Sequence, residues 1–553
     1  MEMRSVVRPV TSTRLVMLFS LCLVAFYNLA TWHALLGLTQ LQGLKAVAFY
    51  VSFGLFLWAA ITLLLMPFSF RPTLKPVLSL VALGSAAAAY FMNDYGISID
   101  TVMMQNVLET NPGEVKALLS GQLFVYLGLL GALPIALIWW LPVTYRRVLP
   151  GLVNKVLVCI GCVLVIAASV GPFYSTYAPI FRDEDKLTHF INPTSYIYAI
   201  GKLTKQTLAI KETVKIQTVG ADSVLSPEAQ ARPKKSLMIF VVGETARADH
   251  FSLNGYARET NPELKKQDIL NFTQVASCGT STAVSVPCMF SKFPRTDYSD
   301  KKGKTYEGLL DMLQRAGLKV VWLDNNSDCK GTCLRVPHSD IPKTQPSPFC
   351  DGLNCLDESL LFGLQDYIDS LKDNAIIVLH SDGSHGPEYY DRYPKTMERF
   401  TPVCRTNQLG SCTSDELKNV YDNTILYTDY FLSKTIDLLR KTASDEGIDT
   451  AMLYFSDHGE SLGEKNMYLH GAPYMFAPSE QTRVPMMLWM SEGFSARFRI
   501  DRTCLMARRD QPFGNLAQVF RRGPVQRRAD GLADPCAKVR LTWFRAAAIG
   551  DVR

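Results

Sequence analysis

Five apolar segments dominate the first third of the chain and limit what it can fold into. They are residues 15–36, 46–68, 76–91, 123–143 and 152–174. Most are close to the roughly 20 residues that a helix needs to cross a bilayer, and the third is the shortest. A cleaved signal peptide would account only for the first segment, which is long for that role and is followed by four more. The sequence therefore predicts a five-helix transmembrane domain over residues 1–174.

The basic residues of the short loops predict how this domain is oriented. They gather before the first segment, between the second and third, and between the fourth and fifth: Arg4, Arg8, Arg14, Arg71, Lys75, Arg146, Arg147 and Lys155. The other two loops carry few positive charges, and positively charged loops stay in the cytoplasm. We therefore expect a cytoplasmic N-terminus, and five spans then put everything after Tyr174 on the opposite side of the membrane.

The cysteines support this topology independently. Of the thirteen cysteines, eight form close pairs in polar surroundings: Cys278/Cys288, Cys329/Cys333, Cys350/Cys355 and Cys404/Cys412. Such pairs predict disulfides and hence an oxidising compartment. A zinc–cysteine site is the alternative, but none of these eight cysteines forms a Cys-x-x-Cys pair.

The segment after the third span carries a polar stripe. Asn106, Thr110 and Glu114 recur every four residues and would share one face of a helix, although Pro112 and Gly113 weaken that helix. This face could hold the amine of a lipid headgroup, and a solvated loop face explains the same pattern. After the last span, residues 175–235 are expected to form helices at the bilayer interface followed by a linker.

The pattern changes at residue 236 to short apolar strands separated by helices. Strands are expected at 237–242, 318–323, 375–379 and 451–455, and helices at 307–316 and 414–442. Buried strands that alternate with helices predict an α/β domain with a largely parallel sheet, which we place at residues 236–504. Ligands bind beyond the carboxyl ends of such strands.

Polar side chains stand at those strand ends. Glu244, Asp457 and His458 are two carboxylates and an imidazole, a combination that suits zinc. A strand-end acid is also a common helix cap or turn former, which is the alternative for each residue taken alone. Further candidates for a second metal or for contacts with phosphate are His385, His470 and Lys330.

A hydroxyl-rich stretch lies between Cys278 and Cys288. It contains Thr280, Ser281, Thr282 and Ser285. Ser and Thr become nucleophiles only when a base or a metal activates them, and the strand-end cluster offers such an activator. The alternative is a surface loop closed by a structural disulfide, and the residues alone do not choose among the four hydroxyls.

Several motifs together resemble those of the lipid A phosphoethanolamine transferases, a family that includes the mobile colistin resistance enzymes. The motifs are Gly243-Glu-Thr-Ala-Arg247, the stretch from Cys278 to Cys288, Gly383-Ser-His-Gly-Pro387, Tyr421-Asp-Asn-Thr424 and Ser456-Asp-His-Gly-Glu-Ser-Leu-Gly463. The resemblance extends from the first span to about Cys504. It implies an alkaline phosphatase/sulfatase-like periplasmic domain on five membrane helices.

The resemblance also implies roles for individual residues. Thr282 would be the nucleophile, and Glu244, Thr282, Asp457 and His458 would surround a catalytic zinc ion. His385, His470 and Lys330 would contact phosphate or a second zinc ion. The phosphoethanolamine headgroup would be bound by Asn106, Thr110, Glu114 and Ser327.

The implied reaction has two steps at the outer face of a bacterial inner membrane. Thr282 would attack phosphatidylethanolamine, the donor, and a phosphate of lipid A, the acceptor, would then take the phosphoethanolamine group. The added amine would reduce the negative charge of lipid A and thus the binding of polymyxins. The expected protein is a monomeric, multi-pass membrane enzyme with no nucleic-acid partner.

The end of the chain departs from the family. Residues 505–553 hold ten Lys and Arg and four Asp, a net charge of +6 that equals that of the whole chain. A change of reading frame explains this segment better than a tail that binds anionic lipid, and it leaves the pairing of Cys504 with Cys536 open. A smaller departure is Asp382, an acid where the family pattern suggests a less charged residue.

Three alternatives follow from the same features. A related enzyme could act on another acceptor, such as a core sugar or a phosphoglycerol polymer. The altered tail could leave an inactive membrane protein. A formylglycine sulfatase is disfavoured, because no Cys-x-Pro-x-Arg sequence surrounds Cys278 or Cys288.

Overall fold

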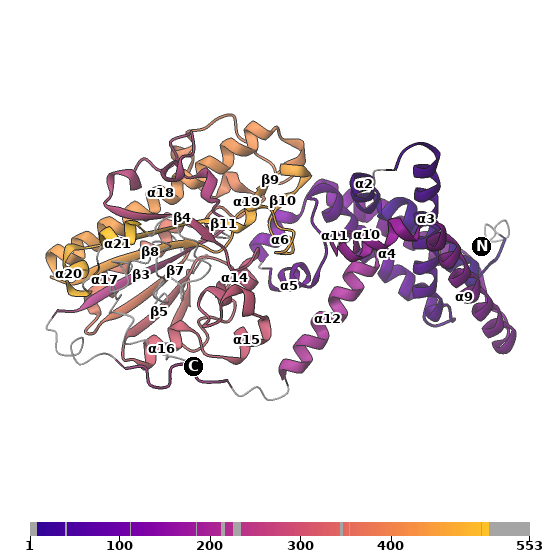
Figure 1. Ribbon diagram of the computed structural model, residues 1–553, viewed down its shortest axis with the longest axis horizontal. Helices are drawn as coiled ribbons and strands as arrows, with labels where there is room; N and C mark the ends of the chain where they lie inside the picture. The colour runs from indigo at the N-terminus through magenta and orange to yellow at the C-terminus, as the bar shows by residue number, and fades with distance from the viewer. Residues whose placement is uncertain are drawn as a thin grey trace, which may run out of the picture. The chain divides into compact units, whose positions relative to one another are not determined.

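The computed structural model divides the chain into two compact units, which we call the apolar unit and the α/β unit (Figure 1). The apolar unit comprises Met1–Met104 and Leu119–Lys205, and the α/β unit comprises Gln105–Leu118 and Gln206–Arg553. The structure describes residues 8–38, 41–110, 112–183, 185–211, 216–224, 234–342, 347–352, 354–498, 500 and 502–507. The four-part division expected from the sequence stays a prediction.

The apolar unit is helical. Its elements are α1 (Ser12–Cys22), a π-helical turn (Leu23–Tyr27), α2 (Leu29–Leu38), α3 (Gly43–Leu65), α4 (Leu74–Asp94), α7 (Gly121–Tyr126), a second π-helical segment (Leu127–Ala132), α8 (Leu133–Trp140), α9 (Val148–Val170), α10 (Tyr174–Asp183), α11 (Asp185–Phe190) and the start of α12 (Thr194–Lys211). Within the described residues, four helical stretches are long and apolar enough to cross a membrane: Gly43–Phe68, Leu74–Asp94, Gly121–Trp140 and Val148–Tyr177. The pair Ser12–Tyr27 and Leu29–Leu36 is a fifth candidate span. The five predicted segments fall on these stretches.

The first candidate span is bent by 58° at Asn28. The Asn28 side chain donates to the carbonyl of Leu23 and to that of Asn192, and it accepts from the backbone N–H of Asn192. Asn side chains compete with backbone groups for hydrogen bonds and so interrupt helices. The bend therefore ties the first span to the segment that precedes α12.

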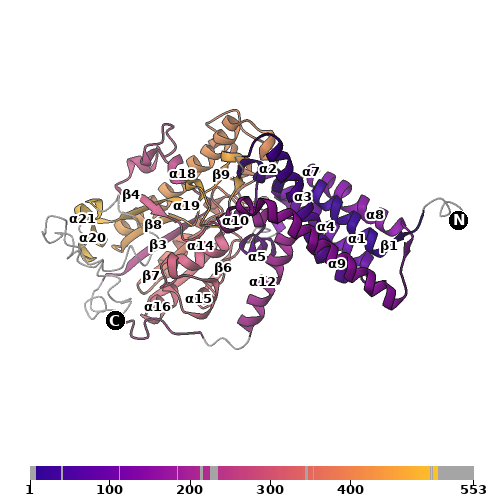
Figure 2. The same ribbon diagram turned by 45° about the vertical axis from the view of Figure 1, so that its right-hand side comes forward.

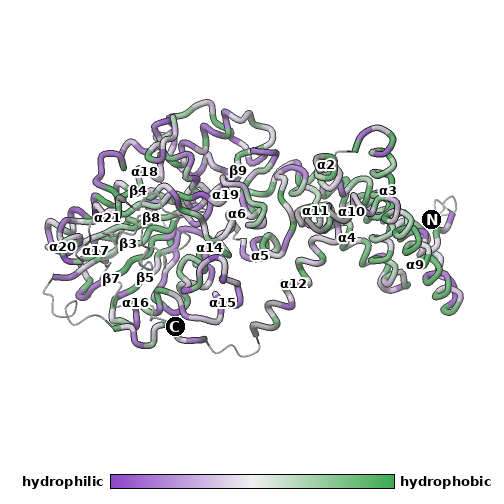
Figure 3. The backbone as a smooth tube through the Cα atoms, viewed as in Figure 1, coloured by the Kyte–Doolittle hydropathy of each residue, from purple (hydrophilic) through white to green (hydrophobic). Residues whose placement is uncertain are grey.

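The long helices of the apolar unit turn hydrophobic side chains outward. Only 11% of the most apolar window of Val148–Tyr177 is buried, and Figure 3 shows hydrophobic residues along α3 and α9. Large apolar surfaces of this kind suit the hydrocarbon of a bilayer, where helices satisfy their own backbone hydrogen bonds. The exposed faces thus support the prediction of a membrane-embedded portion.

The α/β unit is built on a seven-stranded sheet with the order β4-β11-β8-β3-β7-β5-β6. The strands are β3 (Ser236–Gly243), β4 (Ile269–Ala276), β5 (Lys319–Asp324), β6 (His338–Asp340), β7 (Ala375–His380), β8 (Asp449–Ser456) and β11 (Arg483–Met490). Strands β8, β3, β7, β5 and β6 are parallel, whereas β11 runs antiparallel to β8 and β4. Every residue of β3, β7 and β8 is buried, as expected for the centre of a parallel sheet. The predicted largely parallel sheet is confirmed.

Helices cover both faces of this sheet. The principal ones are α14 (Thr282–Met289), α15 (Asp300–Thr305), α16 (Leu309–Arg315), α17 (Leu364–Ser370), α18 (Ser414–Asp445) and α20 (Glu492–Phe498). Val286 of α14 and Leu313 of α16 share a hydrophobic cluster with Phe240 of β3. Figures 1 and 2 show α18 on the opposite side of the sheet. The sheet is thus buried between two helical layers, and its strand ends provide the edge on which a site can form.

The four predicted cysteine pairs are joined as disulfides. They are Cys278–Cys288, Cys329–Cys333, Cys350–Cys355 and Cys404–Cys412, with Cα–Cα distances of 5.9, 5.8, 4.1 and 5.8 Å. Cys22, Cys159 and Cys162, which the sequence places in apolar runs, are free. The bonded cysteines therefore belong to the α/β unit and the free ones to the apolar unit.

Part of the chain lies outside the described residues. It includes residues 508–553 with Cys536, so the frame change and the pairing of Cys504 both stay predictions. Of the expected linker, residues 225–233 also lie outside, whereas Gln217 pairs with Tyr306 and Val219 is buried in the core of the α/β unit. Within the described part, the approach to β3 is therefore packed against the domain.

Candidate active site

Strand register brings the predicted acids together. Gly243 of β3 lies opposite Ser456 of β8, so the next residues, Glu244 and Asp457, emerge side by side. On the other side of β3, Val242 lies opposite His380, the last residue of β7. The carboxyl ends of the three central strands thus form one edge, as expected for a parallel sheet.

Glu244, Asp457 and His458 form a buried cluster. His458 Nε2 lies 3.3 Å from Glu244 Oε1 and 3.3 Å from Asp457 Oδ2. One possible ligand atom from each of the three residues lies within 4.8 Å of the other two. Among the described residues, the other group of His, Cys and acidic side chains that lies this close contains a disulfide. The structure thus brings together the three strand-end residues that the sequence singled out.

Thr282 meets this cluster at the start of α14. Ser281 is extended and precedes the helix, and Thr282 is the first helical residue. Thr282 Oγ1 lies 3.1 and 3.3 Å from the two carboxylate oxygens of Glu244 and 3.5 Å from His458 Nε2. The hydroxyl therefore faces both a carboxylate and an imidazole.

The other three hydroxyls of the stretch are directed elsewhere. Thr280 donates to the carbonyl of Ala472 at 2.6 Å, and Ser285 donates to the backbone carbonyl of Asp457 at 2.6 Å. Ser281 Oγ is buried without a hydrogen bond. Of the four hydroxyls, Thr282 alone contacts the side chains of the cluster. The sequence pattern by itself did not distinguish Thr282 from the other three.

The electrostatics of the cluster fit a cation. Burial and the neighbouring Asp457 raise the pKa of Glu244 well above its usual value, and burial also raises the pKa of Asp457. Burial and the neighbouring His470 lower the pKa of His458, which keeps its imidazole neutral and able to bind metal. Asp457 Oδ2 makes no hydrogen bond. Two buried carboxylates and a neutral imidazole are a donor set that suits zinc.

Neighbouring groups orient the three side chains of the cluster. His458 Nδ1 lies 3.0 Å from the carbonyl of Gly459, which leaves Nε2 directed at the carboxylates. Asp457 Oδ1 accepts from the backbone N–H groups of Thr245 and His458. Asn326 donates to Glu244 Oε2 at 2.9 Å. Asn326 was not among the residues predicted from sequence, because nothing local links it to Glu244.

Two further histidines lie beside the cluster. The ring of His470 is 4.4 Å from that of His458 and 5.3 Å from that of His385. Burial and nearby positive groups, His470 first among them, lower the pKa of His385 well below its usual value. His385 Nδ1 is buried without a hydrogen bond. The structure thus brings His385 and His470 to the cluster, as predicted.

A hairpin sets the position of His470. Strand β9 (Ser461–Leu462) pairs antiparallel with β10 (Tyr468–Leu469), and Ser461 lies opposite Leu469. The flanking residues Glu460 and His470 therefore meet, and Glu460 Oε2 lies 3.1 Å from His470 Nδ1. Tyr389 donates to the other oxygen of Glu460 at 3.0 Å. Sequence reasoning missed Glu460 as a supporting residue, although it lies within the motif that carries Asp457.

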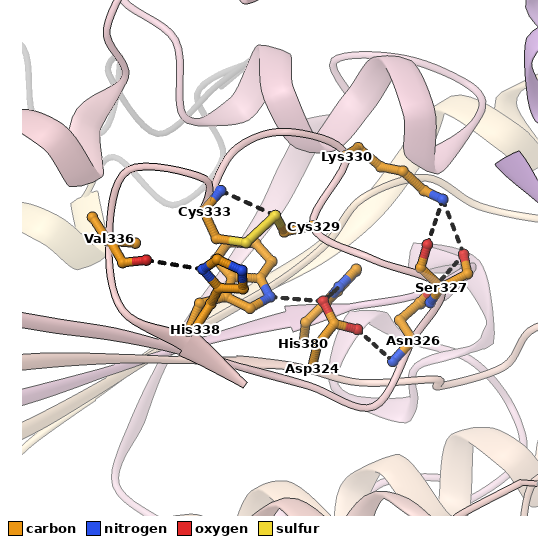
Figure 4. Close-up of a disulfide and its surroundings, with 10 residues drawn as sticks. Asp324, Asn326, Ser327, Cys329, Lys330, Cys333, Val336, His338 and His380 are labelled. Atoms are coloured by element: carbon orange, nitrogen blue, oxygen red, sulfur yellow. Dashed lines mark hydrogen bonds and ion pairs between the residues drawn. A yellow bond between two sulfur atoms is a disulfide. The ribbon is translucent and has the colours of Figure 1, made fainter. Parts of the chain in front are cut away.

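Lys330 and Ser327 lie on the loop after β5, which the Cys329–Cys333 disulfide closes (Figure 4). Lys330 Nζ donates to the carbonyl oxygen of Ser327 at 2.7 Å and contacts its hydroxyl at 3.1 Å. The charge of Lys330 is among the groups that lower the pKa of His385. The ammonium group therefore acts on His385 and is held by its own loop.

The predicted polar stripe does not form a single helical face. Helix α5 (Thr101–Glu109) ends before Thr110, and α6 begins at Pro112 (Pro112–Leu118). Proline lacks an N–H and disfavours helix in the residue before it, so the break falls there. Thr110 donates to the carbonyl of Asn106 at 2.6 Å, and the side chain of Glu114 lies outside the described residues. A headgroup role for these residues stays a prediction.

The unexpected acid Asp382 is paired. Its carboxylate contacts Arg392 Nη1, and Arg392 Nε donates to the carbonyl of His385 at 2.9 Å. Arg392 therefore balances the extra charge and ties together the two ends of the turn that carries His385.

Two family models match the chain. The model for phosphoethanolamine transferase EptA/EptB matches residues 57–208, and the sulfatase model matches residues 236–521. They correspond to the predicted membrane helices and to the α/β domain.

Similar proteins cover nearly the whole chain. Phosphoethanolamine transferase EptA of Escherichia coli K12 is 42% identical over 495 residues, which are 88% of this chain and 89% of that protein. Phosphatidylethanolamine transferase Mcr-1 of Escherichia coli is 41% identical over 434 residues, 76% of this chain and 79% of that protein. The solved structure of the integral membrane lipooligosaccharide phosphoethanolamine transferase A of Neisseria meningitidis has a TM-score of 0.88 at 34% identity and covers 92% of this chain and 94% of its own.

Proposed function

The chain belongs to the phosphoethanolamine transferase family, and from this premise we propose that it moves phosphoethanolamine from phosphatidylethanolamine to a phosphate of lipid A. The names of the similar proteins contain phosphoethanolamine, phosphatidylethanolamine and lipooligosaccharide, which supports the proposed group and the class of lipids involved. The observation that carries the proposal in this chain is the contact of the Thr282 hydroxyl with Glu244 and His458.

Glu244, Asp457, His458 and Thr282 would hold the catalytic zinc ion. Bound there, zinc would lower the pKa of the Thr282 hydroxyl and offset negative charge on a phosphoryl group. The buried Asp457 oxygen that makes no hydrogen bond and the raised carboxyl pKa values support this assignment.

In the first half-reaction, Thr282 is the nucleophile. Its oxygen forms a bond to the phosphorus of phosphatidylethanolamine while the bond from phosphorus to the diacylglycerol oxygen breaks. The hydroxyl already donates toward the Glu244 carboxylate, so its proton has an acceptor at 3.1 Å. The proton taken from Thr282 passes to the diacylglycerol oxygen as diacylglycerol leaves, and the product is phosphoethanolamine-threonine.

In the second half-reaction, a lipid A phosphate attacks the same phosphorus and restores the Thr282 hydroxyl. His385, His470 and Lys330 would contact the phosphoryl oxygens or a second metal ion, and this role fits their position next to the cluster. Preorganised positive and polar groups of this kind stabilise charge that develops in the transition state. The ethanolamine part would bind Asn106, Thr110, Glu114 and Ser327.

The cellular setting follows from the topology and the disulfides. We propose a monomeric multi-pass protein of the bacterial inner membrane with a cytoplasmic N-terminus and a periplasmic α/β unit. Both lipids then present their headgroups on the side where the α/β unit lies. The added amine lowers the negative charge of lipid A, so cells that express the protein are expected to resist colistin and other polymyxins.

Mass spectrometry of lipid A from cells that express the chain tests the proposal. Phosphoethanolamine-modified lipid A is expected with the native chain and not with Thr282→Ala. Unmodified lipid A from intact, expressed protein would contradict the function, and modification of a core sugar or a phosphoglycerol polymer instead would replace the acceptor. Modification that persists in Thr282→Ala would contradict the role of Thr282 alone.

A further inference from the structure

The motif Tyr421-Asp-Asn-Thr424 contributes no residue to the site described above. It lies in the middle of α18, where every residue from Asn419 to Asp429 is buried. Successive residues of a helix point about 100° apart, so four consecutive buried side chains mean that other chain segments surround this turn on all sides. We call residues 421–424 the anchor turn.

Tyr421 of the anchor turn contacts the backbone next to Glu244. Its hydroxyl donates to the carbonyl of Thr245 at 2.6 Å and accepts from the backbone N–H of Arg247 at 2.9 Å. One phenol oxygen therefore joins two backbone groups of the segment that carries a proposed metal ligand.

That segment has an unusual conformation. Thr245 has a φ of +50°, a left-handed value that is uncommon for a residue other than glycine and costly for a β-branched one. On the β8 side, Ser456 Oγ accepts from the N–H of Ala246 at 2.9 Å, and Asp457 accepts from that of Thr245. The turn is thus held from β8 on one side and by Tyr421 on the other.

The remaining residues of the anchor turn hold three other segments. Asp422 accepts hydrogen bonds from Tyr256 and Arg258, and Asn423 accepts from the backbone of Arg399 and Phe400. Thr424 Oγ1 donates to Ser384 Oγ at 2.7 Å, and Ser384 immediately precedes His385.

The two site segments held by the anchor turn also touch each other. Ser384 donates its N–H to the carbonyl of Glu244 at 3.1 Å. A Cβ on Gly383 would lie only 2.6 Å from the same carbonyl oxygen. The Glu244 segment and the His385 segment therefore pack without space between them, and α18 supports both.

We propose that Tyr421 is a positioning residue, whose hydroxyl fixes the left-handed turn at Thr245 and thereby the direction of the Glu244 carboxylate. This role rests on the proposed metal site. Groups that orient metal ligands without touching the metal contribute to affinity, and their loss weakens it by about 10- to 100-fold.

Tyr421→Phe tests the role because it removes the hydroxyl and keeps the ring. It leaves the N–H of Arg247 and the carbonyl of Thr245 without their partner. The matched control is Tyr427→Phe, on the same helix and equally buried, whose hydroxyl contacts the N–H and the carboxylate of Glu358 instead. Ser456→Ala removes the acceptor for Ala246 on the opposite side of the turn and is expected to act in the same direction as Tyr421→Phe.

Two measurements on the full chain in detergent decide the outcome. Zinc affinity, measured by competition with a chelator, is expected to fall about 10-fold or more in Tyr421→Phe and to stay within about 2-fold in Tyr427→Phe. In the zinc-free protein, the rate of backbone amide hydrogen exchange at residues 245–247 is expected to rise in Tyr421→Phe and not in Tyr427→Phe.

The outcomes separate this inference from the proposed function. Equal zinc affinity and equal exchange in Tyr421→Phe and Tyr427→Phe would overturn the role of Tyr421. If the native chain bound no zinc, the metal assignment would fail, and the exchange at residues 245–247 would still decide whether Tyr421 holds the turn.

Discussion

The carboxylate side of the site and its cationic side are held in different ways. The carboxylate side consists of Glu244, Asp457, His458 and Thr282. Backbone N–H groups and buried side chains bind it at several points, such as the two N–H groups on Asp457 Oδ1 and the Asn326 amide on Glu244. Such support suits ligands that must keep one geometry.

The cationic side, which we name after the ammonium group of Lys330, consists of His385, His470 and Lys330, and His385 and Lys330 have fewer supports. His385 Nδ1 has no hydrogen bond, and Lys330 is held by Ser327 of its own loop. His470 contacts the carboxylate of Glu460 and has further contacts besides. Under the proposed function, this difference would suit a resident ion on one side and lipid phosphates that enter and leave on the other.

Glu244→Gln should produce the largest effect, because it removes a charged ligand from the better supported side. Loss of a group that only orients a metal ligand weakens metal affinity by up to about 100-fold, and loss of Glu244 itself should weaken zinc affinity by more than this. Phosphoethanolamine transfer should be lost. Without zinc, the variant should melt at a higher temperature than the native chain, because Glu244 and Asp457 are buried like charges.

The pH dependence of stability in the zinc-free proteins tests whether Glu244 and Asp457 repel each other. The pKa of Glu244 is raised in the fold, so the native chain should lose stability as pH rises above the ordinary glutamate value, until the raised pKa is passed. Glu244→Gln should show a flatter profile in thermal melts. A zinc-free variant less stable than the native chain at pH 7 would contradict the repulsion.

Glu460→Gln should produce an intermediate effect, confined to the cationic side. The carboxylate orients His470 through its Nδ1, and the amide keeps the shape but loses the charge. Transfer should fall by about 10- to 100-fold, while zinc affinity of the carboxylate cluster stays within about 3-fold. Metal titration and a transfer assay on the same preparations measure both quantities.

Tyr389→Phe is the matched control for Glu460→Gln. It removes the hydrogen bond to the other oxygen of the same carboxylate and keeps the charge. A smaller loss of transfer is expected. A loss of zinc as large as the loss of transfer in Glu460→Gln would show that the two sides are not separable.

Local patterns predicted the parts of the molecule that depend on local sequence. Apolar length located the five candidate spans, and buried strands followed by polar residues located Glu244 and Asp457. Both signals lie within a few neighbouring residues, because helices and parallel strands have fixed periods and ends. The break at Pro112 belongs to the same class, since the proline itself causes it.

Supports that cross the sheet were not predictable from such patterns. Asn326 lies 82 residues from Glu244, and Tyr421 lies 176 residues from Thr245. Their contacts depend on the strand order, which puts β3 between β8 and β7, and on α18 packing over that sheet. The bend at Asn28 likewise depends on Asn192, 164 residues away. In each case the partner is specified by topology, which no local window contains.

Removing the disulfide of the Lys330 loop should produce a smaller effect than Glu244→Gln or Glu460→Gln. Like Glu460→Gln, it acts on the cationic side. Asp328 and Lys330 both have left-handed backbone conformations, with φ of +87° and +51°, and the loop between Cys329 and Cys333 is short. Removing the cross-link by Cys329→Ser with Cys333→Ser should cost about 2 kcal/mol of stability, because the unfolded chain gains freedom. The folded loop should also lose its fixed Lys330, so the KM for a phosphatidylethanolamine donor should rise several-fold.

Cys404→Ser with Cys412→Ser is the control for this prediction. Its cross-link closes a loop with a sequence separation of 8, against 4 for the Lys330 loop, and none of the residues proposed to bind metal or phosphate lies in that loop. It should lose a similar stability in thermal melts without a change in KM. Because both pairs weaken the fold to a comparable extent, a rise in KM in the first pair alone would assign the effect to the position of Lys330. An equal rise in both would mean that the cationic side depends on the stability of the whole α/β unit and not on its own loop.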